Sequence, residues 1–96
     1  MNQSVHKKST PSIDAKAVSL QLDRVLQVRG IRAKVAIIDS CCYILLIAHQ
    51  LPKASIAIDW VQTQLQESSF AAIDRIKIYG RQIGQKLPIW QQEFAL

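Results

Sequence analysis

The sequence predicts a small α+β domain, and three observations support that prediction. Of the 96 residues, 49% are apolar and 20% are charged, a balance typical of a folded globular domain. Two segments repeat apolar residues at helical spacing, whereas others alternate apolar and polar residues as strands do. The longest apolar run, residues 41–48, is far shorter than the roughly 18 residues of a membrane-spanning helix.

The chain begins with a polar, unpatterned segment, residues 1–10, which we expect to be a flexible tail. Residues 11–96 are predicted to form one domain. A first helix is expected to begin near Pro11, with Thr10 as its N-cap, although a start at Ser12 is an alternative. Its apolar positions are Val18, Leu22, Val25 and Leu26. Gly30 is predicted to end this helix.

Two strands follow, joined at Asp39-Ser40, which are typical turn residues. Residues 31–39 alternate clearly, but residues 42–49 are apolar on both faces. We expect Tyr43, Leu45 and Ile47 to face the helices, which leaves Ile44 and Leu46 on the opposite face. A slip of one residue in this pairing would exchange the two faces.

A second helix is predicted from Pro52, with an apolar stripe that includes Ala54, Ile58, Val61 and Leu65. A strand over residues 73–82 follows, in which Gly80 marks a bulge or a close approach of another group. The last segment alternates from residue 90 to residue 96 and predicts a strand that closes a hairpin. Its Trp90 and Phe94 are the expected core residues.

The predicted order is therefore α-β-β-α-β-β, a circular permutation of a ferredoxin-like unit. In this fold both helices cover one face of a four-stranded antiparallel sheet. The helices would cover Val35, Ile37, Ile76 and Ile78. The residues expected on the other face, the open face, are Arg32, Lys34, Ile44, Leu46, Arg75, Lys77, Tyr79 and Arg81.

The net charge of +5 and the pI near 9.6 leave two interpretations. The cations either attract an anionic partner or only keep the domain soluble. Exposed Ile44 and Leu46 on the open face would favour a partner surface. We expect a non-catalytic protein-interaction module that binds a protein partner or a second copy of itself as a homodimer. The alternative is a nucleic-acid-binding domain that uses the same cations. The predicted partner-binding residues are those of the open face together with Gln82.

Motifs for nucleotide binding, metalloproteolysis or serine hydrolysis are not found in the sequence. The two cysteines, Cys41 and Cys42, are adjacent, and no CxxC or Cys/His cluster occurs. Alternation along a strand would bury one thiol and expose the other. We therefore expect a reduced, cytoplasmic domain with no enzymatic activity, cofactor, metal or membrane contact. A ligand or redox role for the cysteines is a third alternative.

The C-terminal segment carries a more specific pattern. It runs from Ile73 through Tyr79-Gly80-Arg81-Gln82 and Gly84 to Pro88, Trp90 and Glu93-Phe94-Ala95-Leu96. It resembles a small domain of unknown function found in cyanobacterial proteins, with a V-Y-G-R-Q-x-G strand and turn and a P-x-W-x-x-E-F-x-L ending. The resemblance implies a cyanobacterial source and a domain often joined to other modules, but no activity. Here Gln85-Lys86-Leu87 replaces the acidic residue that precedes the proline in that pattern.

Overall fold

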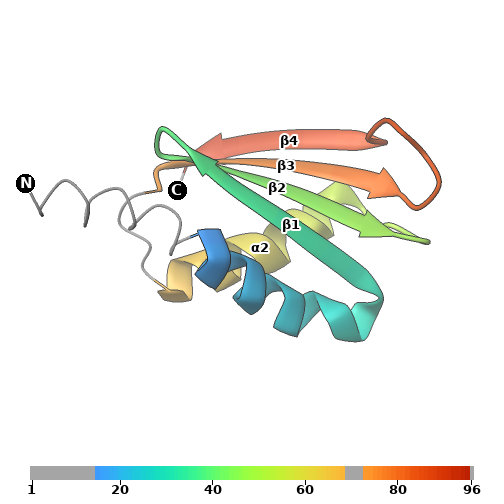
Figure 1. The fold of residues 1–96 in the computed structure, drawn as a ribbon, viewed down its shortest axis with the longest axis horizontal. Coiled ribbons are helices and arrows are strands. Elements are labelled where there is room, and N and C mark those ends of the chain that lie inside the picture. The colour runs from blue at the N-terminus through green and yellow to red at the C-terminus, as the bar shows by residue number, and fades with distance from the viewer. Residues whose placement is uncertain (1–14, 69–72, 96) are drawn as a thin grey trace, which may run out of the picture.

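The computed structural model describes residues 15–68 and 73–95 (Figure 1). The predicted tail over residues 1–10 and the predicted start of the first helix therefore lie outside the described residues. The predicted α+β class is confirmed: an N-terminal helix and α2 (Ala54–Ser68) lie on one side of a four-stranded sheet. The strands are β1 (Ile31–Ile38), β2 (Cys41–Ala48), β3 (Arg75–Gln82) and β4 (Trp90–Ala95), in that spatial order.

The N-terminal helix is described over residues 15–26 and continues as a short 3₁₀ turn, η1 (Gln27–Arg29). Val18, Leu22 and Leu26 follow each other at four-residue spacing and are fully buried, as predicted. Gly30 ends the helix with φ +74°, and its N–H donates to the carbonyl of Gln27 at 3.0 Å. Glycine adopts this left-handed conformation without a steric penalty, so the predicted stop is confirmed.

Polar contacts attach this helix to its neighbours. The Gln21 side-chain amide donates to Gln64 of α2 at 3.1 Å. The Asp23 carboxylate accepts a 3.1 Å hydrogen bond from the N–H of Ala33 on β1, which is an edge strand. The described helix is therefore joined both to α2 and to the edge of the sheet.

The turn between β1 and β2 consists of Asp39 and Ser40 alone, with φ of +50° and +67°. Positive φ at both central residues is the geometry of a tight two-residue hairpin turn that suits the twist of the strands. This turn pairs Ile38 with Cys41 and Val35 with Ile44. The predicted position of the turn is thus confirmed.

The prediction for the two faces of β2 was wrong. Ile44 and Leu46 are 0% exposed and face the helices, whereas Tyr43, Leu45 and Ile47 lie on the open face and are partly exposed. The cause is the register, because directly paired residues point to the same side of a sheet. Val35 faces the helices, so its partner Ile44 must do so as well.

The sheet is mixed, so the prediction of a purely antiparallel sheet was also wrong. β1 and β4 pair antiparallel with their neighbours, but β2 and β3 pair parallel. Parallel neighbours need a crossover connection, usually a helix, and α2 lies between β2 and β3 in the chain. The buried stripe of α2 consists of Ala57, Val61 and Leu65.

The two core residues predicted in the last strand, Trp90 and Phe94, are partly buried and pack against the core. Trp90 pairs with Gly80 of β3, and its ring lies over that glycine. A Cβ at position 80 would approach the ring to less than 3.0 Å. The β2–β3 register continues unbroken through Gly80, so the glycine marks a close approach and not a bulge.

We predict that Gly80→Ala destabilises the domain by about 1–3 kcal/mol, the usual cost of forcing an extra group into a packed site. Denaturant unfolding followed by circular dichroism measures this loss. Gly80→Ala combined with Trp90→Leu is the control, because the smaller side chain leaves room for the methyl group. The double variant should lose less stability than the sum of the two single variants, and strict additivity would contradict the proposed ring contact.

Candidate functional site

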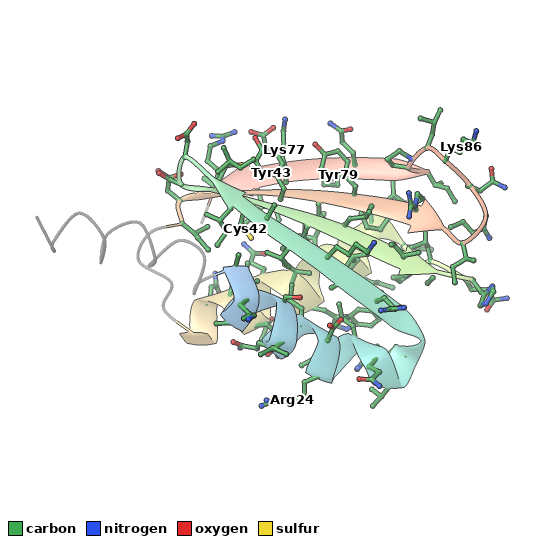
Figure 2. The ribbon with its side chains drawn as sticks, viewed as in Figure 1. Arg24, Cys42, Tyr43, Lys77, Tyr79 and Lys86 are labelled. Carbon is green, nitrogen blue, oxygen red and sulfur yellow. The ribbon has the colours of Figure 1, made fainter. Side chains whose placement is uncertain are left out.

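The open face is the side of the sheet away from both helices (Figure 2). The labelled side chains of Tyr43, Lys77 and Tyr79 extend from that side, whereas Cys42 points toward the helices. Residues paired directly across the strands form rows on this face. From β1 to β4 the two central rows are Ala36, Tyr43, Lys77 and Glu93, followed by Lys34, Leu45, Tyr79 and Gln91.

One end of the open face, near the β1–β2 turn, is partly neutralised by Glu93. Arg75 donates two hydrogen bonds to the Glu93 carboxylate, one of them from Nε at 2.9 Å. Lys77 Nζ lies 3.9 Å from the same carboxylate. The hydrogen bond from Arg75 lowers the pKa of Glu93 below its usual value, so this carboxylate is ionised at neutral pH.

Tyr43 lies beside this cluster. Lys77 Nζ is 5.8 Å from the centroid of the Tyr43 ring, within the range of a weak cation–π contact. Hydrogen bonding with the Cys41 side chain raises the pKa of Tyr43 above its ordinary value. The phenol is therefore neutral at pH 7 and presents an uncharged ring on this face.

The opposite end of the open face, near the β3–β4 loop, carries cations that have no acidic partner among the described residues. Arg32 and Lys34 of β1, Arg81 of β3 and Lys86 of the loop form no ion pair with any described residue. Lys34 and Lys86 are exposed, and Arg81 is partly buried. The positive charge of the face is thus concentrated at this end.

A hollow of about 430 Å³ opens on this cationic part of the face. Leu45 and the small side chain of Ala36 lie at the hollow, and the tyrosine rings and Pro88 add to its apolar lining. Its cationic residues are Lys34, Arg81 and Lys86. Among the described residues that line it, none is acidic. The combination of rings and cations suits a ligand that has both a flat apolar part and negative charge.

Backbone hydrogen bonds attach the β3–β4 loop to the sheet at both ends of the loop. The N–H of Ile83 donates to the carbonyl of Ala48 at 2.9 Å, and the N–H of Ile89 donates to that of Gly80 at 2.7 Å. Within the loop, Gln85 donates to Gln82 at 3.0 Å. These bonds hold Lys86 and Pro88 beside the hollow.

The sequence placed most of the predicted partner-binding residues correctly on the open face. Those residues are Arg32, Lys34, Arg75, Lys77, Tyr79 and Arg81. Ile44 and Leu46 do not belong to this face, for the reason given above. Gln82 pairs with buried Ala48, and its side chain donates to the carbonyl of His49 at 2.8 Å. It therefore connects two strand ends on the other side of the sheet.

Other residues of the open face were missed. Tyr43 and Leu45 were predicted to face the helices, although the two-residue turn between β1 and β2 places them on the open face. Glu93 follows from simple alternation, since Trp90 and Phe94 point to the helices and Glu93 must point away. Lys86 lies in an irregular loop, so no periodicity signals its position.

The two thiols differ, as alternation predicted. Cys42 is buried at 0% exposure, whereas Cys41 is partly exposed on the open face. Burial, reinforced by the neighbouring Cys41, raises the pKa of Cys42 to about 12. Thiolates are the reactive form, so Cys42 is chemically inert at neutral pH.

Within residues 15–68 and 73–95, no three His, Cys, Asp or Glu side chains gather in a group able to hold a metal ion. The helices of this part of the chain are too short or too polar to cross a membrane.

The chain matches no model of a known protein family, and searches of curated proteins and of solved structures found no significant match. The resemblance to the cyanobacterial domain therefore stays a prediction.

We predict that Cys42 does not react with a thiol reagent at pH 8 until the domain unfolds. The Cys41→Ser variant, which keeps only Cys42, should show no labelling in buffer and full labelling in denaturant. The Cys42→Ser variant is the matched control and should label without denaturant. Rapid labelling of Cys42 in the folded protein would contradict its burial.

Proposed function

We propose that this chain is a non-catalytic interaction module and that the open sheet face is its binding surface. The observation that supports this most directly is the asymmetry of the sheet. Both helices cover one face, whereas the other presents Leu45, Ile47 and two tyrosine rings among cations. A contiguous, partly apolar surface of this kind is characteristic of a partner-binding site.

The charge of this face indicates an anionic partner. Glu93 already neutralises part of the charge of Arg75 and Lys77, but the cations around the hollow have no such neighbour among the described residues. A protein that presents acidic side chains around an apolar patch would complement this surface. A second copy fits less well, because a face-to-face homodimer would bring the same cations together.

Single-stranded nucleic acid is the second candidate partner, and one observation favours it. Tyr43 and Tyr79 lie on neighbouring strands of the open face, where the sequence had predicted only Tyr79. Aromatic rings beside cations on an open sheet are the usual means of binding unpaired bases and phosphates.

This proposal does not depend on the finer predictions made from the sequence. The permuted ferredoxin-like arrangement, the cyanobacterial source, the cytoplasmic location and the homodimer all stay predictions. The absence of enzymatic activity is part of the proposal. It would be abandoned if turnover were found that depends on side chains of the hollow.

The experiment that tests the proposal is an NMR titration of ¹⁵N-labelled protein with two anionic probes. One probe is a polyglutamate peptide and the other is a single-stranded oligonucleotide. We expect the perturbed amides to lie in β1, β2, β3 and the β3–β4 loop. Perturbations confined to the helices, or none with either probe at low salt, would overturn the proposal.

The neighbouring residues Leu45 and Leu46 provide a matched pair of variants. Leu45→Asp should keep the fold, with a loss of about 1 kcal/mol or less, but should weaken binding of either anionic probe. Leu46→Asp buries an unpaired charge and should cost at least about 3 kcal/mol. Denaturant unfolding and the NMR titration measure the two effects. Equal destabilisation by both substitutions would show that the two faces are not as described.

Glu93→Gln tests the neutralised end of the face. The substitution removes the carboxylate that holds Arg75 and Lys77, so both cations become free to contact an anion. We expect tighter binding of polyglutamate and a steeper dependence on salt. Asp59→Asn is the control, since it removes an exposed carboxylate from α2. An equal gain in affinity in both variants would show that only the net charge of the protein matters.

A further inference from the structure

The hollow differs from the rest of the open face in its shape. It is lined by Ala36, the smallest side chain of its row, which lies on the edge strand β1 beside the longer side chain of Tyr43. The loop that carries Lys86 and Pro88 borders it and is held to the sheet by the Ile83 and Ile89 amides. Its volume of about 430 Å³ lies in the range of about 300–1,000 Å³ typical of small-molecule sites. One ring system with its attached groups would fit.

The chemistry of the lining restricts what that ring system is. Tyr43 and Tyr79 present aromatic rings, and both are partly exposed on the face. A flat base stacks on such rings, whereas an acidic aliphatic side chain of a peptide has no aromatic ring to stack. The cations at the hollow then require a ligand whose negative charge lies next to its flat part.

The positions of the cations indicate a ligand that carries several negative charges along a chain, and not a single anion. Lys34 comes from β1, Arg81 from β3 and Lys86 from the β3–β4 loop, so the cations reach the hollow from different elements. Arg32 lies two residues from Lys34 on the same face of the edge strand and extends the positive surface beyond the hollow. A strand with a phosphate on each side of a base would match this distribution.

We propose that the hollow is a nucleotide subsite, which rests on the second candidate function of the open face, the binding of single-stranded nucleic acid. One base of single-stranded nucleic acid lies against Tyr43 and Tyr79, and Lys34, Arg81 and Lys86 hold the adjacent phosphates. A duplex does not fit this site, because its bases are stacked within the helix and their faces are not accessible. The chemistry described is common to RNA and DNA, so both are tested.

The experiment is fluorescence anisotropy of labelled oligouridylate and oligothymidylate of about eight nucleotides, the order of one small domain's site size. Binding is measured between about 50 and 200 mM salt, with a matching duplex as competitor. If each of the three cations at the hollow pairs with a phosphate of the strand, the slope of log affinity against log salt should be near −2 for a single strand. The duplex should compete poorly.

Single substitutions distinguish the contribution of base stacking to the affinity from the contribution of charge. Tyr79→Ala should lower affinity by about 5- to 150-fold, the range expected for loss of one stacked base, and Tyr79→Phe should keep most of it. Lys86→Ala should make the salt slope shallower by about 0.7. Arg24→Ala is the matched control, because Arg24 is an exposed cation on the helix side of the molecule (Figure 2). It should change neither the slope nor the affinity by a comparable amount.

Two results would overturn the subsite, and they bear differently on the open face. If oligonucleotides bind but Tyr79→Ala and Lys86→Ala behave like Arg24→Ala, the hollow is not the contact. If no oligonucleotide binds at the lowest salt, nucleic acid is not the ligand. In either case the polyglutamate titration decides independently whether the open face binds an acidic protein. If neither polyglutamate nor any oligonucleotide binds, the proposal of an interaction module is rejected as well.

Discussion

The two-residue turn at Asp39 and Ser40 is the constraint on which the rest of the sheet depends. Both residues adopt positive φ, and Ile38 and Cys41 pair immediately on either side. A turn of this length leaves no freedom in register, so each helix-facing residue of β1 sets a helix-facing residue of β2. β3 pairs with β2 residue for residue, and β4 pairs in turn with β3. The composition of both faces follows from this one turn.

The alternation of β1 and β3 made their faces predictable, because a charged residue recurs at every second position in part of each strand. β2 could not be oriented in the same way, since either of its faces would make a good core. Only the length of the turn, combined with the fact that Val35 faces the helices, shows that its partner Ile44 is buried. The parallel pairing of β2 and β3 was also recoverable, because a helix connecting adjacent strands favours it. The position of Lys86 could not be predicted from the sequence, because an irregular loop has no periodic pattern.

The sheet separates the residues that stabilise the fold from those of the proposed binding surface. Every residue of the buried core described here is apolar, and no polar or charged residue is fully buried among the described residues. Polar and charged groups of the open face contribute little to that core. Exposed ion pairs such as Arg75–Glu93 also contribute little to stability. Substitutions on the two faces should therefore have separable effects on stability and on binding.

Trp90 and Gly80 connect the buried core with the proposed binding surface. The indole lies over Gly80 on the helix side, whereas the adjacent residues Tyr79 and Arg81 point to the open face at the hollow. Gly80 also accepts the hydrogen bond from Ile89 that closes the loop carrying Lys86. The packing that anchors β4 to the core therefore also fixes the strand and the loop that border the hollow. The proposed subsite would therefore be largely formed before a ligand arrives, which would reduce the entropy lost on binding.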